Sequence, residues 1–512
     1  MRHVKCGEER PICIRCISLG ASCNYAGFPK KVALPPKLHV LAPRPRTQEI
    51  PSTFEIEIDE GYQYFELFRD KTSFQILSHT SDIQSLRLIL LQAGILESSI
   101  RHVIAALGAL EKASETTPDP IKVRRNDYLG EPKRHYQNAI KLYSHAISQM
   151  QSAVSNGTQD YRTTLLTCLV NQCFEAWTGN QDLALQQMQT GIKLIQQWKV
   201  DARNPPRASS PIVTAVEADL VRAFDRLAIQ VVCFTAPAAR SPVCNVSLSR
   251  DGREILYHIP RNFTSLQEAG IYQSSVMRYG MHLITTLLSK PEPVPSGRIY
   301  PFNCNAEITE EVLAELNTLI AHIKQWCAAF HVLSQSKLAN GSENMTIAAT
   351  LKIHVNTVHL CLIGLLAADE IVYDSYHEEL SEMVDLAEMI IKARSNESSR
   401  GHFAFDLGVI YPLQLPAQKC RDSRIRKRAV ALLSENPRRE GVWDSVFVGK
   451  MMEWAVDVEE EFMENGYIPA WARIRGVAQS ADMQRRRATL VCQQRISEDS
   501  GDLIIRQKDI CW

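Results

Sequence analysis

Apolar side chains recur at intervals of three and four residues along most of this chain, beginning near residue 60. In one of the clearest stretches the apolar residues are Ile100, Val103, Ile104, Leu107 and Leu110. This spacing gathers apolar side chains on one face of an α-helix. The alternation of every second residue, which is typical of a half-buried strand, is clear only at 54–58. The pattern therefore predicts an all-α body of packed helices.

Seven later segments carry the same helical spacing, and stretches rich in glycine and proline separate them. These segments are 211–235, 266–289, 308–335, 345–371, 377–394, 422–434 and 442–463. The stretches 238–262 and 291–306 are rich in proline and glycine, and we expect surface loops there. We assign 56–490 to one multi-helix domain and 491–512 to a C-terminal tail.

Prolines separate this body from the first residues of the chain. Six of them fall close together, at positions 29, 35, 36, 43, 45 and 51. Proline disfavours regular structure and stiffens an extended backbone, so we assign 26–55 to a basic linker. The same proline density excludes a heptad coiled coil in this segment, and the sequence leaves dimerisation open.

Four of the 14 cysteines fall within residues 6–23. They are Cys6, Cys13, Cys16 and Cys23, with the spacing C-x6-C-x2-C-x6-C and basic residues between them. Such close spacing favours zinc ligation by thiolates. The other cysteines are scattered, as is typical of free thiols in a reducing compartment. No signal peptide is visible, and the longest apolar run is far shorter than the roughly 20 residues of a membrane span.

The charge of the chain is unevenly distributed although its formal net charge is zero. Residues 1–50 hold nine Lys or Arg and three Asp or Glu, a balance of +6. Because the whole chain has 57 residues of each sign, the remainder has a balance of −6. A basic first segment on a mildly acidic body is typical of a nucleic-acid-binding module attached to another domain.

The cysteine spacing occurs together with Lys5, Pro11 and the ending Gly20–Cys23–Tyr25. In this combination the first 25 residues resemble the fungal binuclear zinc cluster family of transcription factors. Four body segments resemble the fungus-specific regulatory domain that follows the cluster in that family. These segments are 101–113, 411–433, 437–445 (PRREGVWDS) and 468–474. The resemblance implies an all-α regulatory domain behind a small zinc-cluster module.

The resemblance also implies that the four cysteines are zinc ligands. Six cysteines hold two zinc ions in that family, and these four match the third to the sixth. Cys13 is then the remaining bridging ligand, and the family's first C-x-x-C would lie upstream of Arg2. Closed structural zinc sites have four ligands, so this set completes neither half of a binuclear cluster. The four thiolates could instead surround one zinc ion, or His3 could serve as a further ligand, although a solvent-exposed side chain is the commoner state of such a histidine.

DNA contact is the role that the resemblance implies for the basic residues of this module. It places Arg2 and His3 toward bases and phosphates and Lys5 beside a ligand, and it favours phosphate contact for Arg10 and Arg15. In the linker, phosphate contact or nuclear import is expected of Lys30, Lys31 and Lys37. The implied partners are CGG-like DNA half-sites, a homo- or heterodimer mate and the transcription machinery, and the implied location is the nucleus.

Other charged groups in the body carry weaker signals. Two further basic clusters are candidates for phosphate contact or nuclear import, and we favour solvated surface for both: Arg424, Arg426, Lys427 and Arg428, and Arg485, Arg486 and Arg487. His354 and His359 lie five residues apart, which is not the i, i+4 spacing of two ligands on one helical face. We interpret them as a histidine at the edge of the core and a surface histidine.

Two functional hypotheses follow. An enzyme is a third and the weakest option, and we expect none, since the nucleotide, zinc-protease and hydrolase motifs that we sought do not occur. In the first, the chain is a sequence-specific regulator of RNA polymerase II genes whose start codon is misplaced or whose first exon is missed. In the second, it is a truncated regulator that has lost DNA binding and acts through protein–protein contacts.

Overall fold

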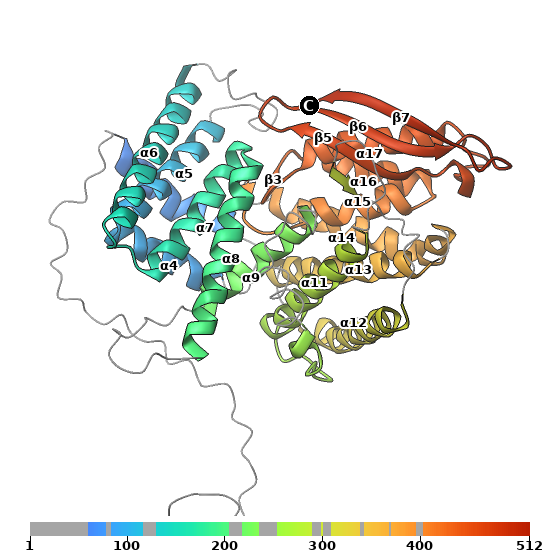
Figure 1. Ribbon diagram of the computed structural model, residues 1–512, viewed down its shortest axis with the longest axis horizontal. Coiled ribbons are helices and arrows are strands. Elements are labelled where there is room, and N and C mark those ends of the chain that lie inside the picture. The colour runs from blue at the N-terminus through green and yellow to red at the C-terminus, as the bar shows by residue number, and fades with distance from the viewer. Residues whose placement is uncertain are drawn as a thin grey trace, which may run out of the picture. The chain divides into compact units, whose positions relative to one another are not determined.

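The computed structural model describes residues 60–77, 83–115, 130–203, 218–234, 253–288, 298–300, 309–337, 342–367, 370–395 and 403–512 (Figure 1). All of these residues belong to one compact unit, Phe54–Trp512. The strand predicted at 54–58, the cysteine module and the linker lie outside the described residues.

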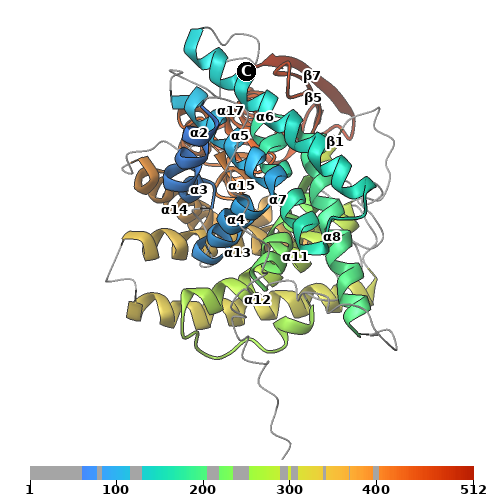
Figure 2. The ribbon, with the colours of Figure 1, turned by 90° about the vertical axis from the view of Figure 1, so that its left-hand side faces the viewer.

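The first part of the body is a series of helices. They are α2 (Gly61–Leu67), the π-helical turn η1 (Phe68–Thr72), α3 (Ser73–Ile76), α4 (Ile83–Leu96), α5 (Ser98–Glu115), α6 (Gly130–Ser155), α7 (Tyr161–Thr178), α8 (Gln181–Arg203) and α9 (Ala218–Phe234). Figure 2 shows α6 crossing the face of α5. The predicted stripe from Ile100 to Leu110 is entirely buried, because α5 lies between α2, α4, α6 and α7.

The second part holds the remaining helices. They are α11 (Leu266–Leu288), α12 (Glu310–Lys337), α13 (Ser342–Leu366), the 3₁₀ turn η4 (Glu370–Tyr376), α14 (His377–Ser395), α15 (Ile410–Lys419), α16 (Ser423–Glu435), α17 (Ser445–Glu460) and the 3₁₀ turn η5 (Ala470–Ala472). The all-α prediction is confirmed, and each of the seven later helical segments contains or overlaps an observed helix. The last one begins at Ser445 rather than 442, because Asp444 caps it by accepting from the backbone N–H groups of Val446 and Phe447.

A buried helix that the apolar spacing did not predict lies at the centre of this second part. All ten residues of α15 are buried, and it contacts α13, α14, α16 and α17. It contains Pro412 in its first turn, where the missing N–H costs nothing, and Pro416 in its interior. The two prolines and the short length of the helix explain why helical periodicity did not reveal it.

The chain ends in an antiparallel sheet, which the sequence analysis did not expect. Its strands are β1 (Arg298–Tyr300), β5 (Arg475–Asp482), β6 (Arg487–Arg495) and β7 (Leu503–Cys511), in the order β1-β5-β6-β7. The segment assigned to a tail, 491–512, thus includes β7 and most of β6. The sheet lies against α17 (Figure 1), where Gln494 donates to the carbonyl of Val458 at 3.2 Å. A polar residue in the buried row of β6 weakens the alternation that would have predicted this strand.

One helix segment among the described residues, Asn344–Leu366 in α13, is long and apolar enough to cross a membrane by length and composition. In the structure 61% of its apolar window is buried inside the protein, and α13 contacts α11, α12, α14 and α15. Leu86–Leu96 and Ser98–Glu115 pass the same test only as a pair, and they are bent by 119° at the break between them. α13 is packed as a core helix of this body.

Candidate functional site

The predicted zinc ligands and DNA contacts all precede the described residues. They are Cys6, Cys13, Cys16, Cys23, Arg2, His3, Lys5, Arg10, Arg15, Lys30, Lys31 and Lys37, and the structure places none of them. Within the part of the chain that the structure describes, no three His, Cys, Asp or Glu side chains are grouped to hold a metal ion. The described residues instead show what the characteristic PRREGVWDS string does.

Glu440, in the middle of that string, is completely buried and connects it to the start of α15. One carboxylate oxygen accepts hydrogen bonds from the backbone N–H groups of Gly408 at 3.0 Å and Ile410 at 2.8 Å. The other accepts from Arg438 Nε at 3.0 Å. A carboxylate that accepts from the N–H of the first helical residue, Ile410, and from that of Gly408 just before the helix also stabilises the positive end of the helix dipole.

The next residues of the string connect the two halves of the body. Gly441 has φ +56°, a left-handed conformation that suits glycine, and a side chain there would collide with Gln230 of α9. Gln181 of α8 donates to the carbonyl of Val442 at 2.6 Å. Trp443 is buried between the rings of Phe234 and Tyr411, at centroid distances of 5.2 and 5.3 Å. The string therefore joins α8 and α9 to α15 and α17.

Arg439 and Asp444 complete this junction. The strands β3 (Arg439–Glu440) and β4 (Trp443–Asp444) pair, and the Arg439 guanidinium lies 3.3 Å from the Asp444 carboxylate. Arg439 also donates to the carbonyl of Trp177 at the end of α7. In the same sheet β2 (Phe403–Ala404) pairs with β3 in parallel. The geometry of the string is that of a structural junction.

A buried network of charges lies beside the junction, at the other end of α15. Glu370 accepts hydrogen bonds from Lys419 and, at 2.9 Å, from Arg473 Nε. Burial acts to raise the pKa of Glu370, but the two adjacent cations outweigh it, so the pKa is lowered from its ordinary value. Burial lowers the pKa of Lys419. This network fixes the end of α15 against η4 and η5.

The structure corrects the interpretation of the basic clusters as solvated surface. Arg426 is completely buried, where it lies 2.8 Å from the Glu459 carboxylate and donates to the carbonyl of Ala417. Its neighbours Arg424 and Lys427 do extend into solvent, with side chains 92% and 61% exposed. Arg486 is also buried, with φ 53° in the turn between β5 and β6. Neither the residue types of the two basic clusters nor their spacing in the sequence indicated that these two arginines are buried.

The histidine interpretation is corrected in the same way. His354 is buried, with Nε2 2.8 Å from the carbonyl oxygen of Gly408 and Nδ1 3.2 Å from Gln273. His359 is half-buried, and its ring centroid lies 6.0 Å from that of Tyr376. Burial lowers the pKa of His359. The histidine expected at the edge of the core is inside it, and the expected surface histidine lies at the edge.

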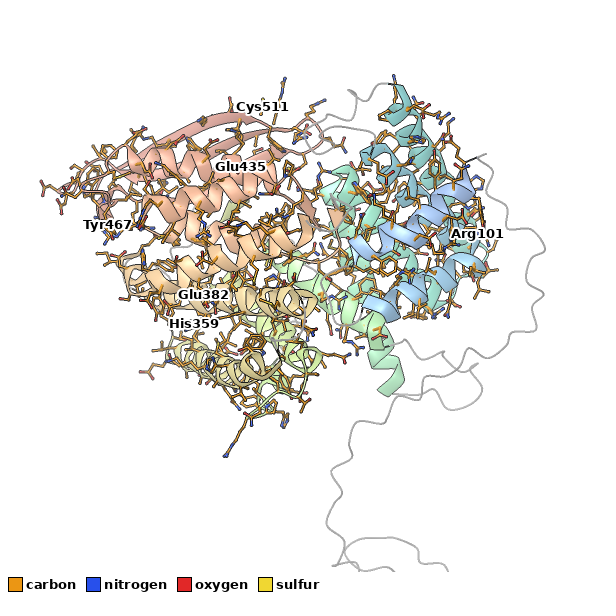
Figure 3. All side chains as sticks on the ribbon, turned by 180° about the vertical axis from the view of Figure 1, so that it is seen from behind. Arg101, His359, Glu382, Glu435, Tyr467 and Cys511 are labelled. Atoms are coloured by element: carbon orange, nitrogen blue, oxygen red, sulfur yellow. The ribbon has the colours of Figure 1, made fainter. Side chains whose placement is uncertain are left out.

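A half-open cleft of about 370 Å³ lies where η4, the α15–α16 connection and the turn at Tyr467 meet. Tyr467 is labelled in Figure 3. The charged groups of the lining pair with each other, since Arg421 Nε donates to Asp374 at 2.8 Å and His377 Nε2 lies 3.7 Å from Asp422. Asp422 also caps α16. These pairings hold the walls of the cleft in place.

Comparison with known proteins identifies the first part of the chain. Residues 1–32 match the fungal Zn(2)-Cys(6) binuclear cluster domain. This range contains all four predicted zinc ligands, all five predicted DNA contacts and two of the three linker lysines. The domain binds a binuclear zinc cluster in its family.

Two curated proteins are similar to the chain. The aspercryptin biosynthesis cluster-specific transcription regulator atnN of Emericella nidulans is 21% identical over 554 aligned residues, which cover 87% of this chain and 83% of that protein. Transcription regulator lscL of Purpureocillium lilacinum is 23% identical over 240 residues, which cover 44% of this chain and 55% of that protein. No solved structure matches the chain.

A zinc-cluster domain followed by an all-α body defines a class of proteins, the zinc-cluster transcription regulators of fungi. The first residues of the chain match the fungal Zn(2)-Cys(6) binuclear cluster domain, and the chain is similar to two fungal transcription regulators. The resemblance expected from the cysteines and from the PRREGVWDS string is thus confirmed.

Proposed function

We propose that this regulator acts in the nucleus, where it binds DNA in a sequence-specific way and controls RNA polymerase II genes. The match of residues 1–32 to the zinc-cluster domain carries the proposal. In this assignment Cys6, Cys13, Cys16 and Cys23 hold zinc, and Arg2, His3 and Lys5 are the residues toward DNA. Arg10 and Arg15 contact phosphates, and the basic linker adds non-specific attraction.

The likeness to a cluster-specific regulator over 87% of the chain supports a target class. We propose that the controlled genes form a biosynthetic gene cluster in a fungal genome. The test is deletion of the gene followed by transcript profiling. Loss of expression confined to one contiguous group of genes is the expected result, whereas scattered changes across the genome would contradict it.

The DNA proposal is tested by competition binding at near-physiological salt. The chain 1–512 is compared with the same chain preceded by a C-x-x-C segment that completes the six-cysteine set. The chain 1–512 should bind weakly and with little sequence preference, with a log–log salt slope of about −0.9 for each phosphate neutralised. The extended chain should prefer a CGG-like half-site strongly. If 1–512 already prefers its site by about 10³-fold, the incomplete ligand set does not disable the module.

The second hypothesis, action through protein–protein contacts without DNA binding, predicts a different outcome of the same experiment. Neither chain would then discriminate the half-site, and zinc would not change DNA affinity. The body carries no enzymatic role in this proposal. Its helices form a packed domain whose two halves are joined by the PRREGVWDS junction.

A further inference from the structure

The last strand of the chain, β7, lies at the end of the four-stranded sheet. Its register with β6 runs from Arg487 opposite Cys511 to Arg495 opposite Leu503. Among the described residues β7 is paired on this one side, because the sheet order is β1-β5-β6-β7. Figure 1 shows it along the outer margin of the sheet, and Figure 3 labels Cys511 at its end. An edge strand presents unpaired backbone N–H and C=O groups to any second strand.

Apolar residues gather on this edge. Leu503, Ile504 and Ile505 follow one another and are 37%, 43% and 64% exposed. Proteins commonly protect an exposed edge with charge, proline or a bulge, and three consecutive exposed aliphatic residues do the opposite. The first three residues of β7 therefore have the composition of a contact surface, and charged residues follow them along the strand.

The backbone of β7 shows which groups face outward. At the two ends of the ladder, Ile496 N donates to Asp502 O at 3.2 Å and Trp512 N donates to Arg486 O at 3.3 Å. The even-numbered residues of β7 therefore form the hydrogen-bonded pairs with β6. Because orientation alternates along an antiparallel strand, the N–H and C=O groups of Leu503, Ile505 and Gln507 point away from β6.

We infer that β7 pairs with β7 of a second copy of this chain, antiparallel and centred on Ile505. A two-fold axis perpendicular to the sheet keeps side chains on their own face, so it pairs residues of equal parity. With Ile505 opposite its own symmetry mate, Leu503 faces Gln507, and all three residues are among those whose backbone groups point outward. The two sheets then form one continuous sheet of eight strands.

The charged residues of β7 favour the register centred on Ile505 over the one centred on Gln507. Centred on Ile505, the pairing sets Asp502 opposite Lys508 on both sides of the axis, and both side chains are exposed. Centred on Gln507, it would instead set Arg506 opposite Lys508 and Ile505 opposite Asp509. Like charges directly opposite in a sheet destabilise it, whereas opposite charges stabilise it. The favoured register has an apolar centre flanked by two complementary ion pairs.

The inferred interface between two copies of β7 depends only on the geometry of the sheet. Its consequence for DNA rests on the proposed function, since a two-fold dimer is suited to two half-sites. Self-association is therefore measured without DNA, so that its failure leaves the DNA proposal standing, and the reverse also holds.

The experiment is sedimentation velocity on the full 512-residue chain over a range of concentrations. The expected result is a reversible monomer–dimer equilibrium. Ile505→Pro should give monomers, because it removes an outward N–H and an aliphatic side chain while β6 does not use that N–H. Leu313→Lys, on the exposed side of α12, removes another exposed aliphatic residue and should leave the dimer unchanged. Circular dichroism of each variant checks that it is folded.

Charge exchange tests the register without touching the backbone. Asp502→Lys or Lys508→Asp alone should weaken the dimer about tenfold, because two symmetry-related pairs change from attraction to repulsion. The double variant should restore wild-type affinity. A chain that stays monomeric at tens of micromolar, a dimer insensitive to Ile505→Pro, or a double variant no better than the singles would each overturn the inference.

Discussion

The buried carboxylate of Glu440 offers a direct test of how the body is held together. Glu440→Gln keeps the shape of the side chain but replaces one acceptor oxygen by an NH₂ group. The two oxygens now accept from Gly408 N at 3.0 Å, Ile410 N at 2.8 Å and Arg438 Nε at 3.0 Å. In either orientation the amide directs a donor at a donor, and Arg438, itself buried, loses its ionic partner.

The expected magnitude follows from the burial of this group. Removing one partner of a buried ion pair costs about 3–5 kcal/mol, because the other charge stays in a site without compensation. Each backbone donor left unsatisfied costs about 1–3 kcal/mol more if the structure cannot relax around it. Against a total stability of about 5–15 kcal/mol, we expect Glu440→Gln to lower the free energy of unfolding by about 3–5 kcal/mol.

Urea unfolding monitored by circular dichroism measures this change. Glu453→Gln is the matched control, because Glu453 forms an exposed ion pair with Lys450 on α17, with side chains 49% and 44% exposed. Such surface pairs contribute about 0–1 kcal/mol. If the two substitutions lower stability equally, or if Glu440→Gln costs less than about 1 kcal/mol, the junction does not stabilise the body as the contacts indicate.

Three further predictions concern other sites. Gly364→Ala should lower the free energy of unfolding in urea by about 1–3 kcal/mol, because the added Cβ would collide with the Tyr373 hydroxyl. At Gly270 the nearest atom to an added Cβ lies 3.7 Å away, so Gly270→Ala should be neutral or stabilising. Equal effects of the two substitutions would refute this prediction. Burial lowers the pKa of His359 below the ordinary value of 6.5, so the free energy of unfolding should fall as the pH drops from 6.5 through the folded-state pKa. His359→Gln should flatten this dependence of stability on pH, and an unchanged dependence in the variant would contradict the prediction. If the chain binds zinc, Cys13→Ser should reduce the zinc content more than any other single cysteine change; an equal loss from Cys327→Ser would place the metal elsewhere.

Helical periodicity predicted most of the body because apolar residues recur at intervals of three and four along its helices, even along α5, where residues 100–110 are all buried. α15 escaped prediction because it is only ten residues long and holds two prolines, one of them in its interior, where proline normally argues against a helix. β6 escaped because its buried row, Ala488, Leu490, Cys492 and Gln494, ends in an amide, and β7 because eight of its nine residues are exposed or half-buried. The pattern of a strand is weak when its buried row is polar or its two faces are alike.

Charge in the sequence was a poorer guide to position than apolarity. Arg426 and Arg424 lie two residues apart in one basic run, yet one is completely buried against Glu459 and the other is 92% exposed. The difference depends on α17, which brings Glu459 to α16 from more than 30 residues later in the chain. A partner that only the tertiary fold supplies cannot be inferred from local composition.

The PRREGVWDS string carried much of the family resemblance, and its contacts give a physical reason for its residue types. Glu440 needs a carboxylate to accept three donors, and Gly441 needs φ +56° beside Gln230. Asp444 needs a short acceptor to cap α17. None of these roles involves DNA, so damage to the string should reduce the amount of folded protein and leave the preference among DNA sites unchanged. Substitutions at Arg2, His3 or Lys5 should do the reverse, which separates a stability defect from a recognition defect in the same chain.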